Sequence, residues 1–309
     1  MQKISKPIVF FGSGPVAAKS LEMLMRHCAI EAVVTKPRPV HHKGDVPVLR
    51  VAKEHNLTVH TVTDKRSLDT LIDTSPFSSQ LGILIDFGII VSQKVIDYFS
   101  KGIINSHFSL LPEWRGADPI TFSILSGQKQ TGVSLMLLTA GMDEGPLLAQ
   151  APYDISPNTT TPALTDALIE LSDNALQTVL PLWANGKAQA LPQDLVTMAA
   201  SKTPTYSRKL EKQDSILDWN KPAEVLEREI RAFTDWPKSR ATFGDLEVII
   251  TKAHVAQNAG TAGKVAIIGK KPAVYCSTGA LVFDLIKPAS KKEMTGEAFL
   301  AGYKRLFLS

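Results

Sequence analysis

Short apolar runs alternate with helical patterns from the start of the chain to about residue 180. The runs are Ile8–Phe11, Ile30–Val34, Leu81–Ile85 and Gly102–Asn105, and the helical patterns after them are Val16–His27, Val46–Asn56, Ser92–Phe99 and Pro119–Ser126. Strands that alternate with helices in this way are typical of a parallel, doubly wound sheet. The pattern therefore predicts an α/β domain in this part of the chain.

A hairpin and one long helix complete this first domain. Gly132–Leu138 and Pro146–Tyr153 form the two arms of the hairpin, and Thr161–Trp183 has apolar residues near helical spacing. The stretch from Asn185 to Pro204 is polar, Ala-rich and interrupted by proline, with no periodicity. We expect a first domain at residues 1–188 and a linker at residues 189–204.

The remainder of the chain, residues 205–309, has the pattern of a small β-rich domain. One helix is expected at Asn220–Phe233, with Asn220 at its N-cap, Pro222 in its first turn and an end before Pro237. Short strand-like runs separated by Gly, Asn and Pro follow at Ala241–Phe243, Leu246–Val255, Gly263–Ile268, Ala273–Cys276 and Leu281–Ile286. Such a series predicts a small open β-barrel of the OB type.

Composition agrees with two soluble domains and argues against a membrane-spanning or disulfide-rich protein. A chain of 309 residues is long for one core, and no run approaches the roughly 18 apolar residues of a membrane span. The N-terminus has no signal-type apolar region, so we expect a cytoplasmic protein, and we expect it to be a monomer. Cys28 and Cys276 stand far apart, which predicts neither a disulfide framework nor a metal site.

Charge is uneven along the chain. Residues 1–204 carry 17 Lys and Arg against 18 Asp and Glu, whereas residues 205–309 carry 17 against 12, an excess of five positive charges. A local excess of this kind is a weak indication of a polyanionic partner, because phosphate neutralisation depends on local charge. A solvated, Lys-rich surface explains the excess equally well.

A glycine motif, Gly12-Ser-Gly14-Pro-Val-Ala17, follows the first run and opens a helix, as a dinucleotide fingerprint does. No acidic residue ends the second run, where Thr35-Lys-Pro-Arg38 stands instead. An NADP-dependent reductase would thus rest only on Gly12, Gly14 and Arg38. A tight strand-to-helix turn that needs glycine is the favoured interpretation.

The strongest chemical pattern is Asn105-Ser-His107-Phe-Ser-Leu-Leu-Pro-Glu-Trp-Arg-Gly116, with Asp143 in the later segment Gly141-Met-Asp-Glu-Gly145. It resembles the active site of the folate-dependent N-formyltransferases. The resemblance implies a Rossmann-like catalytic domain in which Asn105 and His107 hydrogen-bond to the tetrahedral oxyanion. Asp143 would orient the imidazole and take up the proton of the attacking amine.

The resemblance also implies a site for the co-substrate 10-formyltetrahydrofolate, and no metal. The folate would bind against the loop of Ser109, Leu110, Leu111 and Pro112 and against the backbone of Phe87, Gly88 and Ile89. The chain has Asp86-Phe87-Gly88 where Ala-Tyr-Gly is usual in the family.

The acceptor of the formyl group is indicated by other segments. Tyr206–Trp219, Ile230–Pro237, Lys287–Lys292 and Phe299–Tyr303 are similar to the second domain of family members that act on methionyl-tRNA. The implied reaction is formylation of the α-amino group of methionine esterified to initiator tRNA. A basic loop with Lys36, Arg38 and Lys43, shorter than its family counterpart, would contact the tRNA.

Two other functions remain open on the sequence alone. An N-formyltransferase for sugar nucleotides would use the same three residues and the same folate loop, and its second domain can look alike. A non-catalytic tRNA-binding protein is the other alternative, against which the intact Asn105, His107 and Asp143 count.

Overall fold

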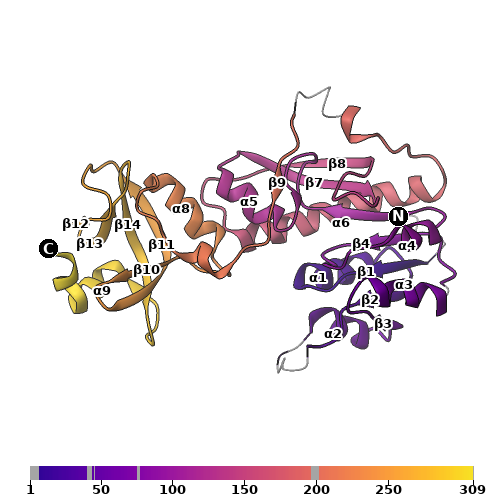
Figure 1. Ribbon diagram of the computed structural model, residues 1–309, viewed down its shortest axis with the longest axis horizontal. Coiled ribbons are helices and arrows are strands. Elements are labelled where there is room, and N and C mark those ends of the chain that lie inside the picture. The colour runs from indigo at the N-terminus through magenta and orange to yellow at the C-terminus, as the bar shows by residue number, and fades with distance from the viewer. Residues whose placement is uncertain (1–6, 40–43, 45, 75–76, 196–201, 309) are drawn as a thin grey trace. The chain divides into compact units, whose positions relative to one another are not determined.

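A computed structural model describes residues 7–39, 44, 46–74, 77–195 and 202–308, and the chain forms two compact units (Figure 1). The first unit comprises the residues up to Gly116 together with Gln130–Asp154 and Thr165–Ser207. The second comprises Ala117–Lys129, Ile155–Leu164 and the residues from Arg208 onward. Two short segments that the sequence assigns to the first domain, 117–129 and 155–164, thus pack in the second unit.

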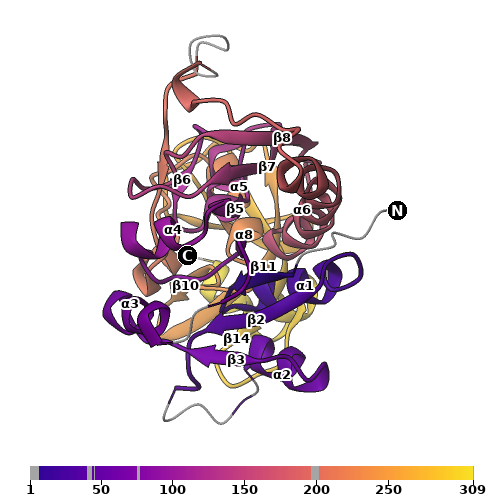
Figure 2. The ribbon, with the colours of Figure 1, turned by 90° about the vertical axis from the view of Figure 1, so that its right-hand side faces the viewer.

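The first unit is built on a seven-stranded sheet with the strand order β3-β2-β1-β4-β5-β7-β8. Figure 2 labels β2, β3, β5, β7 and β8 of this sheet. The strands are β1 (Ile8–Phe11), β2 (Ile30–Thr35), β3 (Val59–Thr61), β4 (Gly82–Leu84), β5 (Ile103–His107), β7 (Gln130–Leu137) and β8 (Leu147–Asp154). Strands β3 to β5 of this order run parallel, and β7 and β8 continue the sheet as an antiparallel hairpin. The doubly wound α/β prediction is confirmed.

The helices that accompany the strands in the described residues include α1 (Pro15–Leu24), α2 (Pro47–Glu54), α3 (Lys65–Thr74), α4 (Gln93–Tyr98) and the long α6 (Thr161–Ala184). A two-stranded parallel sheet joins β6 (Arg115–Gly116) to β9 (Tyr206–Ser207). The elements β3 and α3 are additions, because the apolar pattern predicted no element there. None of the helices in the described part of the chain is long and apolar enough to cross a membrane.

The direction of winding changes between β1 and β4. The chain adds β2 and β3 on one side of β1, then returns and adds β4 and β5 on the other side. In such sheets the ligand-binding crevice lies at the carboxyl ends of the strands where the order reverses. Gly12 follows β1, Asp86 follows β4 and His107 ends β5, so these three residues lie along the same edge.

Burial explains the composition of the central strands. All four residues of β1 and all five of β5 are buried, as expected for parallel strands that are covered on both faces. The ring of Phe11 packs edge-on against Phe87 and Phe99, with centroid distances of 5.6 and 5.8 Å. This aromatic cluster anchors Phe87, and with it the segment after β4.

The second unit contains a six-stranded antiparallel sheet that forms a half-barrel, and the prediction of a small open barrel is confirmed (Figure 1). Its path is β10 (Arg240–Phe243), β11 (Leu246–Ala256), β14 (Ala280–Pro288), β13 (Lys271–Tyr275) and β12 (Val265–Ile268), and β15 (Met294–Thr295) pairs with β14. Helices α5 (Pro119–Ser126), α8 (Ala223–Ala232) and α9 (Gly296–Tyr303) and the 3₁₀ helices η1 (Lys212–Ser215) and η2 (Lys304–Phe307) complete it.

The predicted N-cap of α8 is wrong. Pro222 is the N-cap residue, with φ −60° and ψ 146°, and Ala223 is the first residue of the helix. A proline disfavours helical backbone angles in the residue before it, so Lys221 cannot open a helix capped by Asn220. The backbone N–H of Asn220 instead donates to the carboxylate of Asp218 at 3.0 Å.

Candidate functional site

Strand β5 carries two of the three predicted catalytic residues. Asn105 and His107 are two positions apart, so both side chains lie on the same face of the sheet. Their exposed fractions are only 7% and 6%. A buried amide and a buried imidazole need hydrogen-bonding partners, and the site is organised around those partners.

Asp143 supplies the partners from a turn after β7. It adopts a left-handed backbone conformation with φ 51°. Its Oδ1 accepts a hydrogen bond from Asn105 Nδ2 at 3.3 Å, and its Oδ2 accepts one from the backbone N–H of Gly116 at 2.8 Å. The same Oδ2 lies 3.7 Å from His107 Nδ1. The structure therefore brings Asn105, His107 and Asp143 together.

His107 has a second contact that the sequence did not indicate. Its Nε2 lies 2.8 Å from the carbonyl oxygen of Trp114. A carbonyl oxygen can only accept, so Nε2 carries a proton and donates it there. In the neutral ring, Nδ1 then has a free lone pair and faces the carboxylate of Asp143. His107 can donate to a ligand through Nδ1 only as the imidazolium.

Gln193 contacts the candidate site, and no sequence pattern indicated it. It lies within the predicted linker and is only 4% exposed. Its amide Nε2 donates to the carbonyl oxygens of Asp143 and Gly145, both at 2.8 Å. Its Oε1 accepts a hydrogen bond from Arg115 at 2.7 Å. One glutamine thus ties together the turn that carries Asp143 and the strand that carries Arg115.

Backbone hydrogen bonds also hold the segment that carries Gln193, whose three side-chain hydrogen bonds to Asp143, Gly145 and Arg115 we call the Gln193 clamp. Leu191, two residues before Gln193, pairs with Leu147 in both directions through hydrogen bonds of 2.7 Å. The first part of the predicted linker is therefore packed against the first unit. The available sequence signal for this contact is the proline in Leu191-Pro-Gln193. Proline restricts the backbone angles of the chain, which favours a fixed position for the neighbouring Gln193.

The predicted folate loop is buried and hydrogen-bonded within the protein. Ser109, Leu110, Leu111 and Pro112 are all buried. The carbonyl of Ser109 and the N–H of Leu111 both bond to the hydroxyl of Ser134, at 2.7 and 2.9 Å. Because these backbone groups are occupied within the protein, the loop offers a shaped surface rather than free hydrogen-bonding groups.

The segment after β4 contributes the other predicted folate residues. Phe87 is buried, Ile89 is half-buried, and Gly88 has a left-handed backbone with φ +63°. The carboxylate of Asp86 packs against Gly14, where an added Cβ would lie 1.9 Å from Oδ2. Gly14 has φ −92° and ψ −177°, which other residues also adopt. The glycine is therefore required by this close contact and not, as predicted, by its backbone angles.

The basic loop is only partly described. Lys43 lies outside the described residues. Arg38 is exposed, and its guanidinium donates to the carbonyl of Gly44 at 2.7 Å. Lys36 is different, because its Nζ lies against Gly88, 2.8 Å from the position of an added Cβ. The structure thus places Lys36 beside the predicted folate segment.

The described residues contain no group of three or more His, Cys, Asp or Glu side chains placed to hold a metal ion. What the site does contain is an amide donor, an imidazole and a carboxylate at the carboxyl end of a central strand. That set can stabilise an oxyanion and move a proton, as acyl transfer requires.

Two family models match successive parts of the chain. The model described as formyl transferase matches residues 7–180, and the model described as formyl transferase, C-terminal domain, matches residues 209–304. The first alone spans more than half of the chain.

Individual relatives agree with this match. The chain is 36% identical over 308 residues to the methionyl-tRNA formyltransferase of Chloroflexus aurantiacus, with 96% of both chains covered. It is 32% identical over 307 residues to the methionyl-tRNA formyltransferase of Myxococcus xanthus, covering 97% of this chain and 96% of that one.

A solved structure with a similar fold is the N-formyltransferase of Helicobacter canadensis, in complex with folinic acid and dTDP-3-aminofucose. The TM-score is 0.67 at 16% identity, covering 92% of this chain and 99% of that chain. At this identity the likeness concerns the fold alone. The chain belongs to the formyltransferase family, among the methionyl-tRNA formyltransferases.

Proposed function

We propose that this enzyme transfers the formyl group of 10-formyltetrahydrofolate to the α-amino group of methionyl-tRNA. The observation that carries the proposal is the meeting of Asn105, His107 and Asp143 at the end of β5, beside the point where the strand order reverses. The names of the full-length relatives support the choice of acceptor.

The reaction begins when the neutral amine of methionine attacks the formyl carbon. The carbonyl electrons move to oxygen and form a tetrahedral oxyanion, and its collapse breaks the bond to N10. The amine loses one proton, and N10 gains one. The protein must therefore stabilise the oxyanion and carry a proton across the intermediate.

Asn105 supplies the oxyanion donor in this scheme. Its amide nitrogen has two hydrogens, of which one is directed to Asp143, and the other can point to the developing oxyanion. His107 Nδ1 accepts the amine proton when the ring is neutral and donates to the oxyanion when the ring is protonated. Asp143 stabilises the positive charge that forms on the amine or on the imidazole.

The folate fits at the reversal point of the sheet. The buried loop of Ser109 to Pro112 would form one wall, and the backbone of Phe87, Gly88 and Ile89 another. Lys36 is a cation beside this second wall, so we assign it to the folate rather than to the tRNA. Arg38 and Lys43 remain the proposed contacts of the basic loop with the acceptor.

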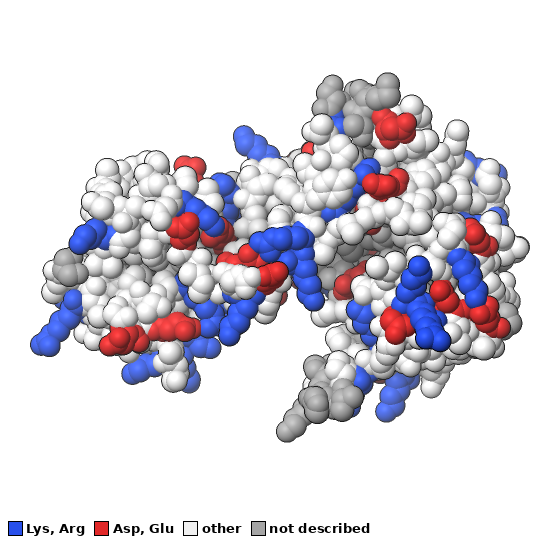
Figure 3. Space-filling view, viewed as in Figure 1, with Lys and Arg blue, Asp and Glu red and all other residues white. Residues whose placement is uncertain are grey.

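The tRNA would also engage the second unit, whose sequence holds the excess of positive charge. Figure 3 shows lysine and arginine side chains over the surface of this unit, with a few acidic side chains between them. Such a surface attracts a polyanion without reading its sequence. A monomeric state, cytoplasmic location and metal-free activity stay predictions.

The test is formylation of charged initiator tRNA by the folate donor, followed by mass measurement of the released amino acid. Asn105→Ala and His107→Ala should each lower kcat by about 10²- to 10³-fold, with the Kd for folate within a few-fold of its original value. Asp143→Asn should cost roughly 10²- to 10⁴-fold. Asn174→Ala, at an exposed asparagine of α6, is the matched control.

Two results would overturn the proposal. One is near-original turnover in any of the three site variants, which would remove that residue from the mechanism. The other is formylation of an amino-sugar nucleotide with no transfer to methionyl-tRNA, which would assign a different acceptor to the same site.

A further inference from the structure

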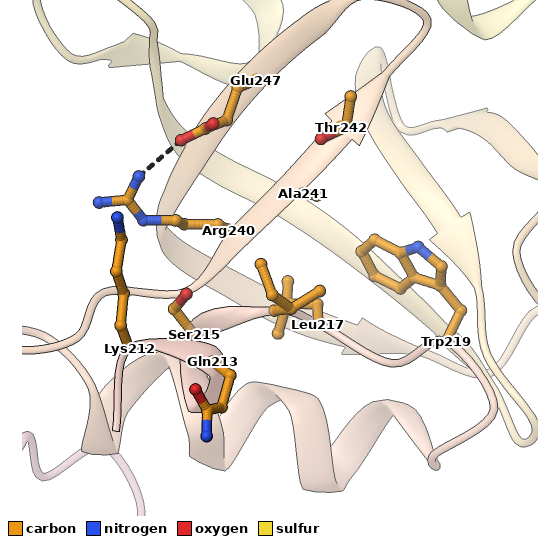
Figure 4. A pocket seen from close by; sticks show the side chains of 10 residues that line it. Lys212, Gln213, Ser215, Leu217, Trp219, Arg240, Ala241, Thr242 and Glu247 are labelled. Atoms are coloured by element: carbon orange, nitrogen blue, oxygen red, sulfur yellow. Dashed lines mark hydrogen bonds and ion pairs between the residues drawn. The ribbon is translucent and has the colours of Figure 1, made fainter. Parts of the chain in front are cut away.

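A pocket of about 530 Å³ lies in the second unit (Figure 4). The residues that line it come from η1, from the segment after η1, and from strands β10 and β11. The volume is in the range of small-ligand sites, which is about 300–1,000 Å³. None of Asn105, His107 and Asp143 lines this pocket, so it is separate from the formyl-transfer site.

One side of the pocket is cationic. Arg240 donates to Glu247 at 2.6 Å, which occupies one end of the guanidinium. Its Nε is buried and has no hydrogen-bond partner among the described residues. Lys212 also lines the pocket, and Figure 4 shows its ammonium group near the guanidinium. The lining thus contains two cations, Lys212 and Arg240, and one acidic residue, Glu247, so its net charge is positive.

The other side is apolar and partly aromatic. The indole of Trp219 lines the pocket across from Lys212 and Arg240 in Figure 4 and is only partly buried. Ile216 also lines the pocket, with 61% of its surface exposed. Its backbone forms a bridge with Arg240, so Ile216 lies close to that cationic residue. A large apolar side chain is thus exposed beside the positive charge.

The pocket combines the apolar side chains of Trp219 and Ile216 with the cations Lys212 and Arg240, and this combination matches the chemistry of a nucleotide. Bases stack on aromatic and apolar side chains, and phosphates are held by lysine and arginine. We propose that this pocket binds one unpaired nucleotide of the tRNA, with its phosphate at Lys212 and Arg240 and its base against Trp219 and Ile216. The inference rests on the proposed function and names a site by which the second unit holds the RNA.

Binding of labelled, deacylated initiator tRNA tests this site directly, with fluorescence anisotropy measured at several salt concentrations. Lys212→Ala should weaken binding and flatten the plot of log Kd against log salt by about 0.7 to 0.9, the value of one phosphate contact. Ile216→Ser removes only apolar surface from an exposed position. It should weaken binding about fivefold without changing the slope, toward the lower end of base-stacking effects.

The matched control is Lys252→Ala, which removes one exposed positive charge from β11 outside the pocket. Arg240→Gln should behave as Lys212→Ala does, while kcat at saturating tRNA and the KM for folate stay unchanged in all these variants. The proposal is overturned if Lys212→Ala weakens binding no more than Lys252→Ala does. It is also overturned if Ile216→Ser binds like the original protein, because general charge attraction would then suffice.

These outcomes are distinguishable from failure of the proposed function. Absence of formyl transfer to methionyl-tRNA in the unaltered enzyme would overturn the function, whereas the binding assay uses deacylated tRNA and needs no catalysis. If the enzyme formylates methionyl-tRNA but the pocket variants bind tRNA like the control, only the proposed nucleotide-binding role of the pocket is refuted.

Discussion

Replacement of Gln193 by methionine removes the polar clamp behind Asp143 while nearly conserving side-chain volume. The substitution deletes three hydrogen bonds of 2.7 to 2.8 Å, to Asp143, Gly145 and Arg115, at a position that is 4% exposed. Each buried partner left unsatisfied costs about 1–3 kcal/mol. At the lower end of that range, the free energy of unfolding of the first unit should fall by about 3 kcal/mol.

Such a loss corresponds to a decrease in Tm of about 6–12 °C, at roughly 2–4 °C per kcal/mol for a unit of this size. The rate should fall as well, because the Gly141–Gly145 turn loses its anchor and Asp143 moves relative to His107. Displacements of about 1 Å near reacting groups can cost up to about 10²-fold. We expect a loss of kcat of ten- to a hundredfold, with a smaller change in the KM for folate.

A second substitution at Gln193 and a control in the same segment test whether the effect comes from the lost hydrogen bonds. Gln193→Glu keeps an acceptor for Arg115 but places a carboxylate oxygen against the carbonyl oxygens of Asp143 and Gly145. It should therefore lose kcat and stability to at least the extent of Gln193→Met. Leu195→Ala, at a position in the same segment that is 48% exposed, is the control. If Gln193→Met retains kcat within twofold and an unchanged Tm, the clamp has no role in holding Asp143.

Three other outcomes follow from the structure. Burial, with a smaller contribution from Asp173, raises the pKa of the Cys28 thiol to about 12, so this cysteine should resist iodoacetamide at pH 8 until the protein is denatured; rapid labelling of the folded protein would refute this. Burial also raises the pKa of Glu229, against the opposing hydrogen bond from Lys221 at 2.7 Å. The folded state then binds more protons than the unfolded state just above pH 4.5, so the free energy of unfolding should decrease as the pH rises from there. Glu229→Gln should lack this decrease, and denaturant unfolding at pH 4 and pH 7 checks it; equal pH dependence in both proteins would contradict it. Arg38→Ala should flatten the salt dependence of the KM for methionyl-tRNA by about one unit and leave the KM for folate unchanged, and an unchanged slope would show that Arg38 does not contact the tRNA.

Local rules predict most of the arrangement of Asn105, His107 and Asp143. The alternation of side chains along a strand places Asn105 and His107 on one face, and the position of β5 next to the strand reversal places that face at a ligand crevice. The glycines that flank Asp143 indicate a turn, and the left-handed backbone of Asp143 itself fits such a turn. These inferences need only short stretches of sequence, and the structure brings the three side chains together as expected.

The contacts that Gln193 and Lys36 make with the site were not predictable, because these two residues come from distant parts of the chain. Gln193 lies 50 residues from Asp143 and 78 from Arg115 in the sequence. Its stretch has no periodicity, since a residue held by three polar contacts need not belong to a regular element. Lys36 likewise follows a strand in a basic loop, and only the parallel sheet brings it beside Gly88.

The guanidinium of Arg115 pairs with Glu144 and Gln193 and not with the carboxylate of Asp143. The carboxylate of Asp143 accepts hydrogen bonds from two neutral donors, Asn105 Nδ2 and the N–H of Gly116, and no lysine or arginine pairs with it among the described residues. Arg115 is close in sequence to Gly116, but Glu144 and Gln193 hold its guanidinium at 3.0 and 2.7 Å. A direct ion pair would neutralise the carboxylate before the reaction starts. Because Arg115 is paired with other groups, no guanidinium in the described part of the chain neutralises the carboxylate that, in the proposed mechanism, stabilises the positive charge on the amine or on the imidazole.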